Sequence, residues 1–418
     1  MVDTKTHKRF LSILATSFVL VCLGAAGFNY LVDPYGLFGS PRIAGFNELK
    51  PAATERVRVT KPYMASRAEP KVVIGGNSRP EIGLDPQSVC WMGVDQPVFN
   101  AAIPGADVFM QVRYVQHAVE SGNARRVLFG VDFLDFLVDS SKVTGEVDWE
   151  RHARSYDGRL RQDPGLHGVP ASFQQAEDML SGLFSMVALG DSVITLTAQR
   201  DPYSATRRED GFNPAQDYLP IIRNEGQAVL FLQKNAEVKK RLQQDGLGVL
   251  DAEGKQTLPL LALRHLLQWA ASRDMEVVLF INPYHSDYLV QIELSGKWQV
   301  FEEWKSQLMA VADEYAVPLW DFNALDRYST ESPPPRNDRQ SMLEWYWEPA
   351  HYRKELGDLM LATMLGRGCG LDINRTPLFG ARITPATLQS HLGSLRSDMK
   401  QFIDQNPDVL RRLSAPNS

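Results

Sequence analysis

The sequence "KVVIGGNSRPEIGL", residues 71–84, contains a strand pattern followed directly by a polar turn. Val72 to Ile74 form a short run of β-branched residues, which is typical of a strand buried on both faces. Two glycines end the run, and Asn77, Ser78 and Arg79 follow. Glycine adopts unusual dihedrals and lets a ligand approach the backbone. The pattern predicts a polar turn with Ser78 at the carboxyl edge of a sheet, where a serine by itself is most often a turn or cap residue.

Four further apolar runs predict strands of the same kind, over 98–101, 127–131, 277–281 and 317–320. Helical patterns accompany them over about 106–120, 258–272, 296–315 and 353–364. Strands that alternate with helices are typical of an α/β fold with a parallel sheet between helices. We therefore expect a five-stranded parallel sheet in a domain made of residues 71–139 and 251–368.

One connection is far too long for an ordinary crossover. About 140 residues separate Phe133 from Arg273, whereas a crossover needs only a dozen or more. The excess leaves the carboxyl edge of the sheet, where open α/β sheets bind ligands. We expect a largely helical cap insertion over 140–250 beside the site, with mere surface decoration as the alternative. A helical tail is expected over 369–418.

The N-terminus contains an uncharged apolar run, "FLSILATSFVLVCLGAAGF", over residues 10–28. Its 19 residues span roughly 28 Å as a helix, close to the hydrocarbon thickness of a bilayer. Basic residues precede the run, and the next one after it is Arg42. The positive-inside rule then predicts a cytoplasmic segment 1–9, a transmembrane signal anchor 10–28, and a linker 29–70 outside. A cleaved signal peptide is the alternative, because Gly24-Ala25-Ala26 offers small residues near the end of the run.

Composition excludes several other classes of protein. The net charge is −6 and no basic stripe is present, so nucleic acid is not an expected partner. No cluster has metal-ligand spacing and no loop matches a nucleotide-binding fingerprint, so neither a metal nor a cofactor is predicted. Cys90 and Cys369 are the only exported cysteines, and either a disulfide or two separate buried thiols fits them.

Two later motifs indicate a catalytic role for Ser78. "FNAAIPGA", residues 99–106, follows the second strand and brings Gly105 to the same sheet edge as a backbone donor. "WYWEPAHYRKELGDLML", residues 345–361, holds Glu348 three residues before His351. A nucleophilic serine needs a base, and the base needs an orienting acceptor.

This arrangement resembles the SGNH (GDSL-like) hydrolase family. Gly76-Asn77-Ser78 stands where that family has Gly-Asp-Ser, Gly105 matches its second block, and Glu348 with His351 matches its Asp-x-x-His block. The resemblance covers roughly residues 70–135 and 275–365. It implies a three-layer, flavodoxin-like fold with Ser78 as nucleophile, His351 as base and Glu348 as the acid that orients it. The oxyanion hole would use the backbone of Ser78 and Gly105.

The third block departs from the family pattern. The family has Gly-x-Asn-Asp, whose asparagine donates to the oxyanion, whereas this chain has Gly130-Val131-Asp132-Phe133. An ionised Asp132 accepts hydrogen bonds and cannot donate one. We expect Asn100, Asn77 or Arg79 to supply the donor, unless two backbone N–H groups suffice. Asp132 would then orient Arg79 or contact a substrate hydroxyl. His285 follows the fourth strand and is either a further substrate contact or an ordinary loop residue.

The resemblance implies a serine esterase or O-acyltransferase that acts on acyl esters. Its anchored plan is similar to that of bacterial envelope-polymer acyl-transfer proteins, such as those of alginate acetylation and teichoic acid D-alanylation. That plan implies the bacterial inner membrane, a periplasmic domain, a cell-envelope or exported glycan as substrate, and a membrane acyl-donor protein as a conceivable partner. The alternative is a catalytically weak or inactive SGNH-like binding or scaffold domain in an envelope polysaccharide assembly.

Overall fold

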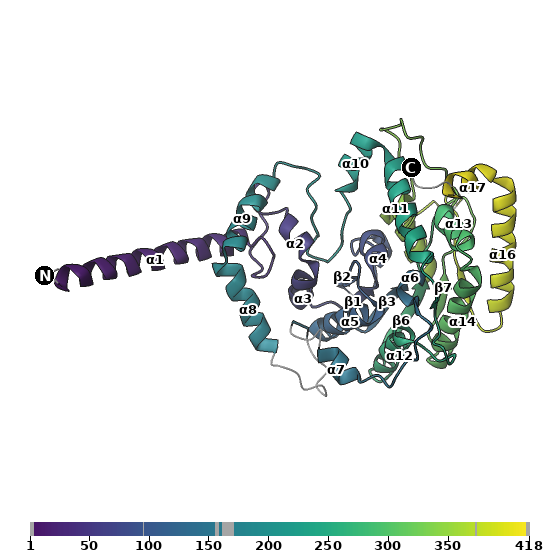
Figure 1. The fold of residues 1–418 in the computed structure, drawn as a ribbon, viewed down its shortest axis with the longest axis horizontal. Coiled ribbons are helices and arrows are strands. Elements are labelled where there is room, and N and C mark those ends of the chain that lie inside the picture. Colours follow the sequence, from purple (N-terminus) through teal and green to yellow (C-terminus); the bar gives the residue numbers. More distant parts are fainter. Residues whose placement is uncertain (1–3, 95, 155–158, 161–170, 373, 415–418) are drawn as a thin grey trace.

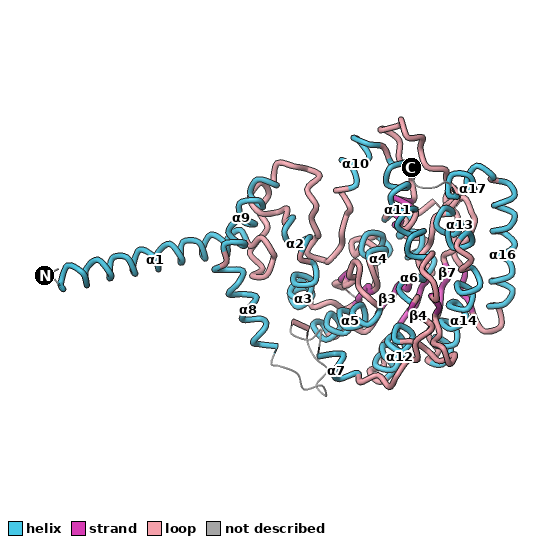
Figure 2. The backbone as a smooth tube through the Cα atoms, viewed as in Figure 1, coloured by secondary structure: helices cyan, strands magenta, loops and turns pink. Residues whose placement is uncertain are grey.

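The structure is mixed α/β with a mostly parallel central sheet and one long apolar helix at the N-terminus (Figures 1 and 2). It is a computed structural model that describes residues 4–94, 96–154, 159–160, 171–372 and 374–414. The sheet has the order β10-β7-β6-β3-β1-β2.

Five strands of the sheet are mutually parallel and coincide with the apolar runs recognised in the sequence. Each is short and buried on both faces, which is why almost every position in it is apolar. Their bounds are β1 Val72–Gly75, β2 Val98–Asn100, β3 Arg126–Val131, β6 Glu276–Ile281 and β7 Leu319–Asp321.

The sixth strand corrects the prediction of a five-stranded, wholly parallel sheet. β10 (Ala381–Ile383) pairs antiparallel with β7 at the edge of the sheet, with Ala381 opposite Asp321. The segment expected to be a helical tail therefore contributes a strand before its helices, α16 (Leu388–Gln405) and α17 (Pro407–Ser414). Three residues with only Ile383 fully buried carry no periodicity from which a strand could be recognised.

Alternate residues of the strands point to opposite faces of the sheet and belong to two separate hydrophobic cores. Val73, Phe129 and Leu279 point into the larger core, whereas Ile74 and Phe280 point into the smaller one. The larger core is built with α5 (Val108–Gly122), α12 (Leu258–Ala271), α13 (Ser286–Leu294) and α14 (Trp298–Glu314). The smaller core is built with α15 (Lys354–Leu365). Helices thus cover both faces of the sheet.

The segment between β3 and β6 holds most of the extra structure. A short antiparallel pair, β4 (Val138–Asp139) with β5 (Leu247–Gly248), joins its two ends. Within it lie α7 (Trp149–Arg154), α8 (Ala171–Phe184), α9 (Met186–Ala198), α10 (Tyr218–Glu225) and α11 (Gln227–Leu242). Figure 1 shows α11 beside the α/β body and α8 and α9 at the base of α1.

The N-terminal helix α1 (Thr4–Val32) projects away from the body (Figure 1). It is long and apolar enough to span a membrane. Two short helices, α2 (Pro51–Glu55) and α3 (Val57–Ala68), lead from it to β1.

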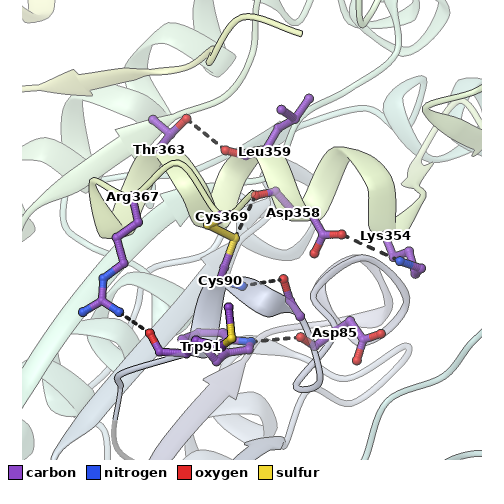
Figure 3. The surroundings of a disulfide bond; sticks show 11 residues. Asp85, Cys90, Trp91, Lys354, Asp358, Leu359, Thr363, Arg367 and Cys369 are labelled. Carbon is purple, nitrogen blue, oxygen red and sulfur yellow. Dashed lines mark hydrogen bonds and ion pairs between the residues drawn. A yellow bond between two sulfur atoms is a disulfide. The ribbon is translucent and has the colours of Figure 1, made fainter. Parts of the chain in front are cut away.

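A disulfide joins Cys90 to Cys369 across 279 residues of sequence, with their Cα atoms 4.6 Å apart (Figure 3). Cys90 lies in a single turn of 3₁₀ helix, Val89–Trp91, and Cys369 follows α15. The sequence left a bridge and two separate thiols open, and the structure has the bridge. Disulfides persist in oxidising compartments. Cys22, in α1, is a free cysteine.

Gly76 gives the first test of this fold. Its φ is +131°, and a Cβ there would lie 2.7 Å from the carbonyl oxygen of Gly130. We expect Gly76→Ala to lower the free energy of unfolding by about 1–3 kcal/mol, measured by urea denaturation of the full chain in detergent. Gly393→Ala is the control, because that helical glycine has open space around its Cβ position. Equal stability of the two variants would contradict the prediction.

Candidate functional site

Ser78 is the first residue of α4 (Ser78–Gly83), directly after β1. The Asn77 side chain caps this helix by accepting a hydrogen bond from the Arg79 N–H at 2.9 Å. The Ile103 N–H donates to the carbonyl of Gly76 at 2.9 Å, which ties the loop after β2 to the end of β1. Ser78 is thereby held at the carboxyl edge of the sheet.

Buried charges hold α4 from beneath. Glu81, on the helix, accepts from Lys61 Nζ at 2.7 Å and from Arg207 Nε at 2.8 Å. Lys61 comes from α3 and Arg207 from the inserted segment. Because a buried carboxylate needs partners of opposite charge, this cluster of three charged side chains fixes the position of the helix that carries Ser78.

A β-hairpin brings His351 and Glu348 to the serine. The hairpin pairs β8 (Tyr346–Glu348) with β9 (His351–Tyr352). His351 Nε2 lies 2.7 Å from Ser78 Oγ, and His351 Nδ1 contacts Glu348 Oε1. With Nδ1–H donated to the carboxylate, Nε2 is the acceptor for the serine hydroxyl. The three residues predicted to form a triad therefore lie within hydrogen-bond reach of one another.

The Glu348 carboxyl is buried and ionised. Burial raises its pKa, but the neighbouring His351 charge and hydrogen bond, with the Ala350 N–H at 2.6 Å from Oε2, outweigh burial and lower the pKa overall. Asp321, the last residue of β7, instead binds Lys305 Nζ at 2.6 Å and His391 Nε2 at 2.9 Å. Glu348 is thus the carboxylate that orients His351.

The backbone N–H groups of Ser78 and Gly105 have no protein hydrogen-bond partner among the described residues. Gly105 adopts φ +62° and lines the same cavity as Ser78. Asn100, expected as a further donor, lies elsewhere. Its Nδ2 donates to the carbonyls of Pro80 and Leu84 at 2.8 and 2.9 Å, so both amide protons are used in holding the end of α4.

Arg79 and Asp132 form a buried ion pair beside the site. Asp132 Oδ2 also accepts from Tyr284 Oη at 3.1 Å, and Arg79 Nε donates to the Ala350 carbonyl at 2.7 Å. Asp132 does not line the cavity, whereas Arg79 does. The charge of Asp132 is therefore neutralised by Arg79.

Asp135 is a site residue that sequence reasoning missed. It follows β3 in the short helix α6 (Phe133–Phe136). Asn77 Nδ2 and Gln111 Nε2 both donate to its Oδ2, at 2.9 and 2.8 Å. Burial raises its pKa more than these bonds and the Arg79 charge lower it. The only signal was a second acidic residue three positions after Asp132.

His285 lies outside the cavity that Ser78 lines. Its Nε2 donates to the Glu331 carbonyl at 2.7 Å, and its Nδ1 accepts from the Asp287 N–H at 3.1 Å. It caps α13 and is fully buried, and it does not line the cavity. A histidine that follows a strand is here a capping residue.

The cavity at the triad has a volume of about 240 Å³. The inserted helix α11 forms one wall with Lys234, Glu237, Val238 and Arg241. Lys234 and Glu237 pair at 2.6 Å. Sequence reasoning missed these residues because nothing in an amphipathic helix shows which of its faces meets a site formed by another segment. The other lining residues are Asn77, Ser78, Arg79, Gly105, Leu134, Asp135, Tyr288, Ala350 and His351.

Among the described residues, no group of three or more His, Cys, Asp or Glu side chains is placed to hold a metal ion. Comparison with protein-family models, with curated proteins and with solved structures finds no match to this chain.

The Arg79–Asp132 pair provides a test of the site's architecture. Asp132→Asn leaves the Arg79 guanidinium buried without its counter-charge, and breaking a buried pair costs about 3–5 kcal/mol. We expect that loss in urea denaturation. The double variant Asp132→Asn/Arg79→Met removes both charges and should recover part of it. A single variant as stable as the wild type would show that the pair does not organise this region.

Proposed function

We propose that this chain is a membrane-anchored serine esterase or O-acyltransferase of the SGNH hydrolase type. The observation that carries the proposal is the 2.7 Å approach of Ser78 Oγ to His351 Nε2, with Glu348 bonded to the other ring nitrogen. A serine, a base within hydrogen-bond reach and an acceptor that orients the base make up an activated nucleophile.

The chemistry follows from these positions. Ser78 Oγ attacks an ester carbonyl while His351 Nε2 takes its proton, and Glu348 stabilises the imidazolium. The tetrahedral oxyanion accepts hydrogen bonds from the backbone N–H groups of Ser78 and Gly105. His351 then protonates the leaving alkoxide, and an acyl-enzyme remains on Ser78. Water as the second acceptor makes the protein an esterase, and a sugar hydroxyl makes it an O-acyltransferase.

The order of the parallel strands supports the same family. Apart from the antiparallel β10, the sheet runs β7-β6-β3-β1-β2, which is the 2-1-3-4-5 order of flavodoxin-like folds. The triad lies at the carboxyl ends of these strands, where such sheets bind ligands. This fold-level likeness supports the assignment without choosing a substrate.

The substrate class rests on the surroundings of the site. A helix able to span a membrane and a disulfide suit a domain on the exported side of the bacterial inner membrane. The cavity is small and lined largely by polar and charged groups, which suits a short acyl ester on a polar carrier. We therefore propose a cell-envelope or exported glycan as substrate, with a membrane acyl-donor protein as partner if the reaction is a transfer.

A fluorophosphonate probe tests the nucleophile. We expect covalent labelling of the full chain in detergent, abolished by Ser78→Ala because the attacking oxygen is gone. Glu348→Gln should slow labelling by about 10³–10⁴, as loss of the orienting carboxylate does in serine hydrolases. Ser88→Ala is the control, since Ser88 lies outside the cavity. Absence of labelling in folded protein would favour the alternative, a binding or scaffold domain.

Asp135 supplies the third oxyanion donor in this proposal. Both described hydrogen bonds of its carboxyl group go to Oδ2, and the residue lines the cavity with Ser78. Oδ1 is therefore the oxygen left for a ligand. A neutral carboxylic acid can donate from Oδ1–H, as an asparagine would, and the raised pKa of Asp135 favours that neutral form.

Replacing Asp135 distinguishes a donor from a carboxylate. Asp135→Leu should slow probe labelling by about 10²–10³, the cost of one oxyanion donor, whereas Asp135→Asn keeps an N–H donor and should keep most of the rate. The wild-type rate should also fall as pH rises through the Asp135 pKa, because the acid loses its proton. Asp135→Asn should lack that fall. An asparagine variant as slow as the leucine variant would refute the donor role.

A further inference from the structure

The pair α8–α9 exposes an apolar surface next to α1. Its helical segments Phe173–Phe184 and Met186–Ala198 meet at 63°, and we call them the elbow. The large apolar side chains of the elbow that are between 51% and 79% exposed are Phe173, Leu180, Phe184, Met186, Val187, Val193 and Ile194. So many exposed apolar side chains on one element mark an interaction surface.

The charges of the elbow are few and mostly turned toward the protein. It contains no Lys or Arg, and its acidic residues are Glu177, Asp178 and Asp191. Asp178 binds Tyr63 and Arg159, and Asp191 binds Tyr35 and Arg56. From residue 179 to 198, Asp191 is the only charged residue. The outward face of this part of the elbow is therefore uncharged.

Asn29 fastens the elbow to α1 at the end of the apolar run 10–28. The side chain is fully buried. Its Nδ2 donates to the Leu183 carbonyl at 2.9 Å, and its Oδ1 accepts from Ser192 Oγ at 2.9 Å. One amide thus binds both arms of the elbow near its bend. The elbow is held level with the outer end of the segment that is able to span a membrane.

We infer that the elbow lies in the lipid interface around the outer end of α1. Figure 1 shows α8 and α9 on opposite sides of the C-terminal end of α1, both crossing its direction. If α1 is perpendicular to the membrane plane, helices that cross it lie along that plane. An amphipathic helix in this position buries its apolar face about 5–10 Å into the headgroup and acyl boundary.

Lipid fits this surface because the elbow continues the apolar surface of α1. Residues 5–21 of α1 are exposed, and Ala26 and Asn29 are buried against the rest of the protein. A bilayer that surrounds the exposed part of α1 therefore ends where the elbow begins. The elbow adds a second contact that fixes the tilt of the body, and hence the height of the Ser78 cavity above the membrane.

Spin labelling of the full chain in nanodiscs, one chain per disc, tests the inference. Cys22→Ala removes the free thiol, and the disulfide occupies the other two cysteines. A nitroxide is then attached to Met186→Cys on the elbow. Ala15→Cys, on α1, is the lipid reference and Ser397→Cys, exposed on α16, is the aqueous reference. The measurement compares how often the nitroxide collides with two reagents. Oxygen concentrates in lipid, whereas a nickel chelate stays in water.

We expect the Met186 label to favour oxygen over the chelate severalfold more than the Ser397 label does. A Met186 label as open to the chelate as the Ser397 label would overturn the inference, even if the Ala15 label lies in lipid. A Met186 label that neither oxygen nor the chelate reaches would also overturn the inference, because protein would then cover the elbow. Since no outcome depends on Ser78 chemistry, this test and that of the proposed function fail independently.

Discussion

The buried guanidinium of Arg79 joins the separate segments that make up the site. It forms an ion pair with Asp132, which follows β3, and donates to the Ala350 carbonyl in the hairpin of His351. Its flat face lies over the rings of Tyr284 and Tyr288, at 5.0 and 5.2 Å from their centroids, which belong to the segment after β6. One side chain adjacent to Ser78 thereby contacts three other loops at the carboxyl edge of the sheet.

The ion pair with Arg79 explains why the acidic residue Asp132 can occupy a position at which the family that the sequence resembles has an asparagine. An isolated carboxylate beside a developing oxyanion would raise the energy of the transition state, but the pair of Arg79 and Asp132 carries no net charge. The pairing also uses Arg79, one of the three expected replacement donors. The other two are used elsewhere, because Asn77 donates to Asp135 and Asn100 donates to the carbonyls of Pro80 and Leu84. Asp135, held by Asn77 and Gln111, is a further polar group that lines the cavity.

The inserted segment serves two regions of the molecule. α11 forms one wall of the cavity, whereas α8 and α9 pack on α1 through Asn29. These parts belong to one segment of chain, whose two ends are joined by the pairing of β4 with β5. In our proposal that segment relates the position of the reacting serine to the membrane surface.

The parallel core strands, their flanking helices and the Ser78, His351 and Glu348 set could be predicted from the sequence. Burial on both faces requires continuous apolar runs, and the carboxyl ends of parallel strands meet at one edge, so local patterns place these residues together. The roles of Asn100, Asp132, Asp135 and His285 could not be predicted, because each depends on which neighbour the side chain reaches. The strand β10 could not be predicted either, because it forms only against the edge of the folded sheet. Hydrogen-bond partners, pKa shifts and the face that α11 presents to the cavity arise from contacts between segments distant in sequence. They become defined only when the chain folds, because no local pattern encodes which side chain of another segment will be the partner.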